Sequence, residues 1–327
     1  MVDVRSPGEY MHGHIPGAHL IPLFDNEERI LVGITYKNVN RQTAIKKGLG
    51  IVGPKMAEFV RLAEEIAGDN PLLLYCWRGG MRSQSMGWLF DTAGIHTRVL
   101  NGGYKQYRRY LRTRFMEARH LLILGGYTGS GKSEILREIA LRQQQVIDLE
   151  ELACHKGSAF GAIGQKPQPT TEQFENNLFE RWRKLDMDST IWLEDESKSI
   201  GSIQVPDEIF RTMKCSPVIM ISLPLAMRIE RLVREYTGCD PSLLLTSIRN
   251  ISKRLGHENT LAATNSLEKG DFHSVADITL RYYDKAYSHT LEKKRTSQLH
   301  VLELNEDNPS AAADIIISFA REKGLLL

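Results

Sequence analysis

The chain has 327 residues and a formal net charge of +2, and at roughly 150 residues per domain its length suggests two domains. Hydrophobic residues make up 42% and charged residues 25% of it, which excludes a disordered chain, and no apolar run approaches the ~18 residues of a membrane span. Four scattered cysteines exclude a disulfide scaffold or a zinc knuckle, and the start lacks a secretory signal, so we expect a cytoplasmic protein with reduced thiols and no membrane partner.

Strand and helix patterns alternate in the first third of the chain. Residues 57–67 place Phe59, Leu62 and Ile66 on one helical face, and residues 83–93 predict a second helix. Residues 72–75 and 97–100 predict short buried strands. Asp3-Val4-Arg5 resembles the end of a first strand, and because only two residues precede it we expect that strand to be clipped. The order predicts a parallel sheet with helices on its faces.

The same rhythm begins again further along the chain. We expect strands at 121–124, 146–149, 190–193 and 218–222, with helices at 133–142 and 225–236. The stretch between Tyr110 and His120 contains no Pro, Gly or Ser, so we expect a helical link there. The sequence therefore predicts two α/β domains, at residues 1–112 and 113–327, the second with a helical C-terminal part.

Positive charge gathers just before this boundary. Only Glu117 opposes a run of six cations, which are Lys105, Arg108, Arg109, Arg112, Arg114 and Arg119. Such a run is either a solvated helix face or a patch for a polyanion such as RNA. In a helix Arg108 and Arg112 share a face, whereas Arg109 lies about 100° away. Lys105, Arg108 and Arg112 are therefore the candidate RNA contacts here.

The first chemical motif follows the predicted strand at 72–75. It consists of Cys76, Trp77, Arg78, Gly79, Gly80, Met81, Arg82 and Ser83. A loop that enters a helix N-terminus directs backbone N–H groups inward, and these groups together with Arg82 stabilise an anion. We therefore expect Cys76 to be a nucleophilic thiolate, with the rest of the loop binding an anionic donor; the alternative is a buried, inert cysteine.

Several segments around this cysteine resemble rhodanese domains. Residues 3–10 and 13–18 resemble the opening signature of that family, and Asn101-Gly102-Gly103-Tyr104 resembles its closing element. The resemblance implies that Cys76 carries or attacks a chalcogen. The spacing from Cys76 to Arg82 is C-x5-R, one residue longer than in rhodaneses and similar to the related cell-cycle phosphatases. A phosphatase is therefore the rival interpretation, although the loop contains no acidic residue.

The second motif begins after the predicted strand at 121–124. Gly126, Tyr127, Thr128, Gly129, Ser130, Gly131, Lys132 and Ser133 match the full pattern GxxxxGK followed by Ser or Thr. This P-loop predicts a P-loop NTPase-like domain in which backbone N–H groups and Lys132 hold phosphate oxygens, with Mg²⁺, if it binds, on Ser133. Asp148 and Asp195 follow predicted strands and are the candidate acids of this domain, the alternative being solvated turns or helix caps.

Other residues of the second half are weaker candidates. Arg228, Arg231 and Arg234 recur on the polar face of one helix, where they bind a diphosphate or RNA or else pair with Glu230 and Glu235. A loop at 155–161 could reach the P-loop, and the tyrosine-rich run 281–287 suggests either base stacking or, more simply, the core of a C-terminal helix.

A rhodanese-like domain followed by a P-loop domain resembles the bacterial tRNA 2-selenouridine synthase family. The resemblance rests on residues 49–56, 76–83, 125–133 and 194–197. It implies that wobble 2-thiouridine in tRNA becomes 2-selenouridine, with selenophosphate and geranyl diphosphate as co-substrates and an S-geranylated intermediate. It also implies a selenophosphate-producing enzyme as partner and no tightly bound cofactor. Two further alternatives stay open: a persulfide carrier fused to an ATP-dependent kinase, and a phosphate-binding regulator without catalysis.

Overall fold

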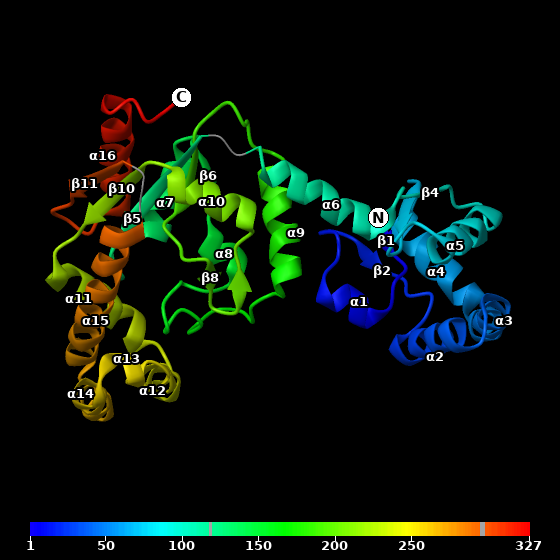
Figure 1. The fold of residues 1–327 in the computed structure, drawn as a ribbon, viewed down its shortest axis with the longest axis horizontal. Helices are drawn as coiled ribbons and strands as arrows, with labels where there is room; N and C mark the ends of the chain where they lie inside the picture. The colour runs from blue at the N-terminus through cyan, green and yellow to red at the C-terminus, as the bar shows by residue number, and fades with distance from the viewer. Residues whose placement is uncertain (118–119, 295–297) are drawn as a thin grey trace. The chain divides into compact units, whose positions relative to one another are not determined.

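The computed structural model describes residues 1–117, 120–294 and 298–327, without the side chains of 288–294. The chain forms two compact units, Met1–Thr113 and Arg114–Leu327. Each unit has its own parallel sheet covered by helices, which confirms the predicted α/β class (Figure 1). The boundary falls within helix α6 (Gly103–Phe115), where the sequence predicts a helical link.

The first unit has a four-stranded parallel sheet. Its spatial order is β2 (His19–Leu20), β1 (Val2–Asp3), β3 (Leu72–Tyr75) and β4 (Thr97–Val99). The first strand, expected to be clipped, is present as the two-residue β1 and pairs with a neighbour on each side. The helices of this unit besides α6 are α1 (Pro7–His12), α2 (Asn26–Asn38), α3 (Arg41–Val52), the 3-10 turn η1 (Gly53–Lys55), α4 (Met56–Ala67) and α5 (Met81–Thr92).

The second unit has a five-stranded parallel sheet. Its order is β11 (Leu299–Glu303), β10 (Val218–Ser222), β5 (Leu121–Gly126), β7 (Ile191–Glu194) and β6 (Gln145–Ile147). Every residue of the central strand β5 is buried. The chain leaves β5 at the point where strand order reverses, which is where open α/β sheets bind ligands. A small hairpin, β8 (Ser199–Ile200) and β9 (Ile203–Gln204), lies outside this sheet.

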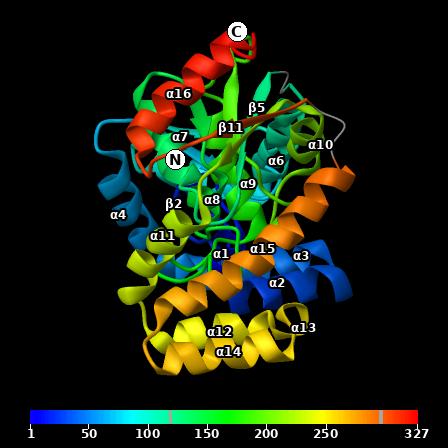
Figure 2. The ribbon, with the colours of Figure 1, turned by 90° about the vertical axis from the view of Figure 1, so that its left-hand side faces the viewer.

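Helices cover this sheet and form a separate cluster beside it. They are α7 (Lys132–Leu141), α8 (Leu149–Ala153), α9 (Thr171–Trp182), α10 (Asp207–Cys215), α11 (Leu225–Thr237), α12 (Pro241–Asn250), α13 (Ser252–Leu255), α14 (His257–Glu268), α15 (Phe272–Lys294) and α16 (Pro309–Glu322). Apolar side chains of α7 and α16 pack on Trp192 and Ile219 of the sheet. Helix α15 runs alongside α11 and α14, whose shared core includes Leu244 and Leu280 (Figure 2).

The predicted elements have counterparts within a few residues, and the structure adds helices that were not predicted one by one, among them α9, α10 and α16. Helices α2 and α3 were not predicted, because Ile30 and Ile34 of α2 are about half exposed and blur the apolar face. Strand β11 was also missed, since it forms the sheet edge and most of its side chains are exposed. Asp148 is not part of a strand, because the chain turns there into α8.

Candidate functional site

Cys76 lies at the carboxyl end of β3, immediately before the loop that leads into α5. Its side chain is buried, with 4% of its surface exposed. Ser83, in the first turn of α5, donates a hydrogen bond from its hydroxyl to the Cys76 sulfur over 3.2 Å. The sulfur also lies 3.9 Å from the carbonyl oxygen of Gly80. The predicted loop therefore surrounds the thiol with polar groups.

The surroundings of Cys76 favour its thiolate. Burial alone would raise the pKa of the thiol, but hydrogen bonds from the Ser83 hydroxyl and from the backbone N–H groups of Ser83 and Arg78 lower it. The positive charge of Arg82 acts in the same direction. The net result is a Cys76 pKa below its usual value, as the helix N-terminus argument predicts.

Two glycines let the closing element lie directly on this loop. Gly79 and Gly103 both have positive φ, and a Cβ on Gly103 would overlap the carbonyl oxygen of Cys76. The backbone N–H of Tyr104 donates to that oxygen over 2.9 Å, and the N–H of Lys105 donates to the carbonyl of Trp77 over 2.9 Å. The first turn of α6 therefore fixes the backbone of the cysteine loop.

Arg82 also forms an ion pair outside the cysteine loop. Its guanidinium donates to Glu9 of α1 over 2.7 Å, and Glu9 also pairs with Arg29 over 3.1 Å. Burial would raise the pKa of Glu9, but the hydrogen bond and charge of Arg82 lower it to about 2. Arg78, by contrast, is exposed and makes no ion pair among the described residues. Arg78 is therefore the cation more available to an incoming anion.

The P-loop connects β5 to α7 as predicted. Gly129 and Gly131 have positive φ, which lets the backbone curl around the space that a phosphate would fill. The Lys132 ammonium donates to the carbonyl of Gly126 over 3.0 Å, across the loop. The Ser133 hydroxyl donates to a Glu150 oxygen over 2.8 Å. The loop thus has the cradle, the cation and the hydroxyl that a bound phosphate requires.

The acids beside this loop include residues that the sequence analysis did not single out. Asp148 accepts from the N–H of Glu151 over 2.6 Å and so caps α8, the alternative left open for it. The acid facing Ser133 is Glu150, two residues later, which the sequence analysis missed. Glu194 is fully buried and accepts from the N–H groups of Leu149 and Glu150 over 2.9 and 3.0 Å. Asp148 therefore caps α8 within a larger carboxylate group that also contains Glu150 and Glu194.

Burial and neighbouring negative charges raise the pKa of two carboxyls in this group, Glu194 and Glu196. Burial, followed by the negative charges of Asp148 and Glu150, raises the pKa of Glu194 well above its ordinary value. Burial and Glu150 raise the pKa of Glu196 in the same way, against the opposing charge of Lys132. Gly157 of the 155–161 loop lies against this group: a Cβ on it would lie 2.8 Å from Glu196 and 2.9 Å from Glu150. That loop therefore does reach the P-loop site.

Asp195 is held by the long C-terminal helix α15. The Tyr287 hydroxyl donates to Asp195 over 2.5 Å and accepts from the N–H of Gly126 over 3.3 Å. Its ring packs edge-on against Tyr127, with ring centroids 5.6 Å apart. The tyrosine-rich run thus belongs to a helix, as the simpler interpretation held, and one of its members supports the start of the P-loop.

Arg228 and Arg231 are occupied by protein partners rather than open to RNA. Arg228 is buried, pairs with Asp284 over 2.7 Å and donates to the carbonyl of Thr128 over 3.2 Å. Arg231 pairs with Glu134 over 2.6 Å and with Asp307. The expected partners Glu230 and Glu235 bind His273 and Lys156 instead. These arginines therefore support the P-loop through contacts within the protein. This corrects the prediction that Arg228 and Arg231 contact RNA.

The basic stretch forms helix α6, but its exposed face differs from the predicted one. Arg108 is only 9% exposed and turns inward, whereas Lys105, Arg109 and Arg112 are exposed. These three residues are spaced i, i+4 and i+7, and so share one face. Arg114 pairs with Glu117 over 2.7 Å, and the predicted Arg119 lies outside the described residues. The exposed cationic face is therefore Lys105–Arg109–Arg112, not Arg108–Arg112.

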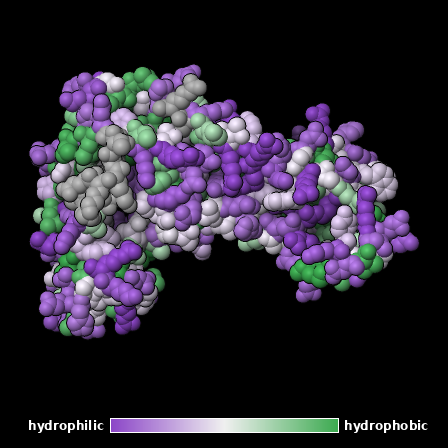
Figure 3. All heavy atoms as spheres, in the orientation of Figure 1, coloured by the Kyte–Doolittle hydropathy of each residue, from purple (hydrophilic) through white to green (hydrophobic). Residues whose placement is uncertain are grey.

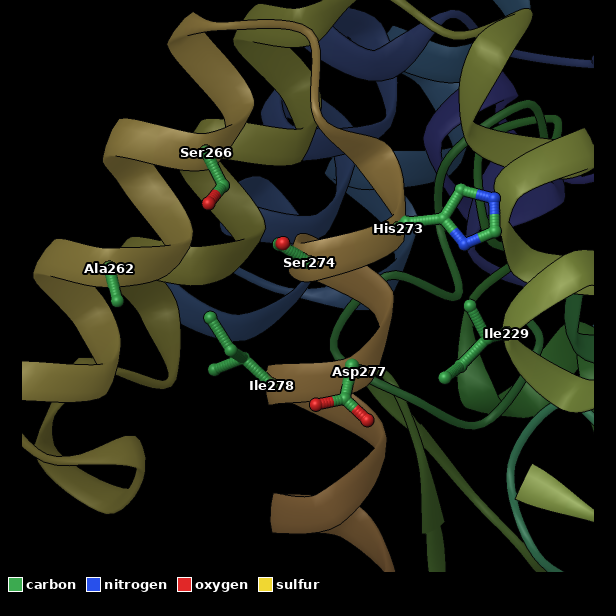
Figure 4. A pocket seen from close by; sticks show the side chains of 7 residues that line it. All are labelled: Ile229, Ala262, Ser266, His273, Ser274, Asp277 and Ile278. Carbon is green, nitrogen blue, oxygen red and sulfur yellow. The ribbon is translucent and has the colours of Figure 1, made fainter. Parts of the chain in front are cut away.

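The second unit has a surface hollow between α11, α14 and α15 (Figure 4). Its lining residues are Ile229, Ala262, Ser266, His273, Ser274, Asp277 and Ile278. Two of its charged groups already have partners: Asp277 accepts from Arg281 over 2.9 Å, and His273 lies 3.6 Å from Glu230. It contains none of the residues that the motifs predict.

The described residues hold neither a cluster of metal ligands nor a membrane-spanning helix. Across residues 1–117, 120–294 and 298–327, no three His, Cys, Asp or Glu side chains are arranged as ligands of a metal ion. Every helix in the same ranges is too short or too polar to span a bilayer.

Comparison with known proteins assigns both units. The family model described as a rhodanese-like domain matches residues 1–110, and the model described as the tRNA 2-selenouridine synthase AAA domain matches residues 119–240. A tRNA 2-selenouridine synthase of Nitrosomonas europaea is 33% identical over 91% of this chain and 90% of its own length. Those of Cupriavidus pinatubonensis and Bordetella petrii are 34% and 35% identical, over 90% of this chain and 89% and 87% of theirs. The predicted order, a rhodanese-like unit before a P-loop unit, is confirmed.

Proposed function

The chain belongs to the tRNA 2-selenouridine synthase family. From that membership we propose that it converts wobble 2-thiouridine in tRNA to 2-selenouridine. Selenophosphate is the selenium donor, and an S-geranylated intermediate is made from geranyl diphosphate. One observation carries this proposal: a single chain holds both a cysteine whose pKa is lowered at an anion-binding loop and a complete P-loop. The cysteine thiolate suits attack at a carbon bonded to a chalcogen, and the P-loop suits the binding of a diphosphate.

In this scheme the P-loop unit makes the sulfur a leaving group. The sulfur of 2-thiouridine attacks the first carbon of geranyl diphosphate, a carbon–oxygen bond breaks, and diphosphate departs. Lys132 and the backbone N–H groups of the P-loop stabilise the charge on the departing diphosphate. Ser133 and Glu150 place two oxygen atoms 2.8 Å apart, a donor set that suits Mg²⁺. When bound, Mg²⁺ would neutralise part of the diphosphate charge.

Cys76 acts at the second stage, either as nucleophile or as carrier of a Cys–Se species. Its thiolate attacks C2 of the S-geranylated uridine and expels geranylthiol, which takes up a proton. Selenium from selenophosphate then displaces Cys76, and hydrolysis of the selenium–phosphorus bond releases phosphate. A Cys–Se carrier would need a two-electron oxidant, because selenophosphate delivers selenium at the level of selenide. The lowered pKa of Cys76 favours the nucleophile role because it supplies thiolate at neutral pH for the attack, and protonation of the departing geranylthiolate draws that step forward.

The rival functions are less well supported by the same residues. A C-x5-R phosphatase needs a protonated acid near the cysteine, but Glu9, which reaches the loop through Arg82, has a pKa of about 2 and is ionised at neutral pH. A persulfide carrier fused to a kinase would turn over ATP without RNA. A phosphate-binding regulator would need no lowered cysteine pKa.

The test compares tRNA nucleosides by mass spectrometry. Purified protein receives tRNA with wobble 2-thiouridine, selenophosphate and geranyl diphosphate, and 2-selenouridine is the expected product. Omitting geranyl diphosphate should leave 2-thiouridine unchanged, and a separate incubation with ATP alone should show no turnover. Selenation without geranyl diphosphate would refute the intermediate, and ATP hydrolysis without RNA would favour the kinase. In cells, loss of the gene should remove 2-selenouridine, and a selenophosphate-producing enzyme should be required as its partner.

A further inference from the structure

An exposed tryptophan sits directly beside the reactive cysteine. Trp77 is 38% exposed, although it follows the buried Cys76 in the chain. Its ring packs on the buried Tyr104, with centroids 5.9 Å apart, and its carbonyl accepts from the N–H of Lys105 over 2.9 Å. The side chain is therefore held on one side while part of its surface remains open to solvent. Because the ring is already held in place, it loses little conformational entropy when a flat ligand stacks on it.

A cationic helix face starts at the same point. Lys105, whose backbone holds Trp77, is followed on one face of α6 by Arg109 and Arg112. At 1.5 Å per residue, the three side chains span about 10 Å of the helix. Figure 3 shows mainly hydrophilic residues over the visible side of α6. The tryptophan thus marks one end of a positively charged ridge.

We propose that Trp77 and the Lys105–Arg109–Arg112 face form a seat for single-stranded RNA, in which the target pyrimidine stacks on Trp77 while the neighbouring phosphates lie along α6. This inference rests on the proposed function for the identity of the RNA. An unpaired loop base can swing out and stack on an aromatic ring, and the cations suit the backbone on either side of it. Trp77 directly follows Cys76 in the chain, so a base stacked on its ring would be held at the cysteine loop. The three cations are spread over about 10 Å of helix, which suits successive phosphates of a strand better than the single compact diphosphate of the geranyl donor.

The chain offers a matched control for Trp77. Trp88 lies in the same unit on α5 and is 64% exposed, so it is a second tryptophan that solvent reaches, away from the motif. Trp182 and Trp192 are buried and contribute a constant background. Fluorescence of the full-length chain is titrated with tRNA carrying wobble 2-thiouridine, in wild type, Trp77→Phe and Trp88→Phe. We expect tRNA to quench wild type and Trp88→Phe alike, and most of the quenching to be lost in Trp77→Phe.

Affinity provides the second readout. Trp77→Ala should weaken tRNA binding about 5- to 150-fold, the effect of losing one base stack, whereas Trp77→Phe should stay within about threefold and Trp88→Ala should match wild type. The rate at which iodoacetamide alkylates Cys76, followed by peptide mass, shows whether each variant keeps the loop intact.

The outcomes separate this seat from the proposed function. If Trp77→Ala keeps an intact loop and binds tRNA as wild type does, the seat is refuted even when wild type selenates normally. If Trp77→Ala loses affinity for geranyl diphosphate but not for tRNA, the ring holds the lipid and the seat is likewise refuted. If wild type binds tRNA with Trp77-dependent quenching but forms no 2-selenouridine, the seat stands and the proposed reaction fails.

Discussion

The hydroxyl of Ser83 donates to the sulfur of Cys76 over 3.2 Å, from the first turn of the helix that the cysteine loop enters. Both side chains are buried, so the hydrogen bond is shielded from competing water. It is the strongest of the interactions that lower the Cys76 pKa against the cost of burial. The Ser83–Cys76 pair therefore sets how much thiolate exists at neutral pH.

Ser83→Ala should move the reactivity of Cys76 to higher pH. A lowered pKa means that thiolate forms at a lower pH than for an ordinary cysteine, so removing the hydrogen bond shifts the alkylation profile upward. The measurement is the iodoacetamide alkylation rate of Cys76 against pH, by peptide mass. Ser85→Ala, an exposed serine on the same helix, serves as the control and should leave the profile in place. Identical profiles for Ser83→Ala and wild type would contradict the assignment.

Cys76→Ser should abolish selenium incorporation while tRNA affinity stays within about threefold, well under one ~1.4 kcal/mol decade. The reason is that the substitution removes a nucleophile but leaves the cations around it. Nucleoside mass spectrometry and a binding titration measure the two effects. Normal selenation by Cys76→Ser would remove the cysteine from the reaction, and a large loss of affinity would indicate that the thiol helps to hold the RNA.

Lys132→Ala should block geranyl transfer but let the protein convert a tRNA that is geranylated beforehand. Lys132 lies across the P-loop, 3.0 Å from the carbonyl of Gly126, where it can reach a diphosphate. The two steps are followed by mass spectrometry of the nucleosides. Lys184→Ala, an exposed lysine of the same unit, is the control and should retain both steps. Equal loss of both steps in Lys132→Ala would show that the P-loop also serves selenation.

Replacing Lys105, Arg109 and Arg112 with Gln should flatten the salt dependence of tRNA binding. Removing one cation that neutralises a phosphate of a single strand lowers the slope of log K against log salt by ~0.7, so we expect the triple variant to lower it by about 2. Arg108→Gln should leave the slope unchanged, because Arg108 is buried, and should instead lower the free energy of unfolding. Arg61→Gln on α4 removes one exposed cation of the same unit outside this face and should leave the slope unchanged. An unchanged slope in the triple variant would mean that this face is merely solvated.

Arg228→Met should destabilise the second unit by about 3 kcal/mol, the low end for breaking a buried ion pair, since Asp284 is 25% exposed. The variant leaves the Asp284 carboxylate and the Thr128 carbonyl without this donor. Arg234→Gln on the same helix should cost at most about 0.5 kcal/mol, because that side chain is 67% exposed. Urea unfolding of both variants provides the comparison. Equal stabilities would show that Arg228 is free to serve a ligand, as the sequence analysis allowed.

The buried strands and both loops could be predicted from the sequence because their signals are local. Residues 72–75 and 121–124 are short apolar runs, and each precedes a glycine-containing motif that only makes sense where a strand turns into a helix. Cys76 and Lys132 are identified in the same way, since the chemistry of the surrounding loop residues fixes their environment. The absence of Pro, Gly and Ser between Tyr110 and His120 also predicted a helical link, and α6 covers the start of that stretch.

The partners of these residues were decided only by the tertiary structure. Glu9 meets Arg82 from 73 residues away, and Tyr287 meets Gly126 from 161 residues away. Glu150 rather than Asp148 accepts the hydrogen bond from Ser133, whereas Asp148 caps α8. Arg108 turns inward although periodicity alone treats every face of a helix alike. Periodicity gives the spacing of side chains along an element, whereas burial and pairing depend on which other elements pack against it, and that is a property of the whole fold.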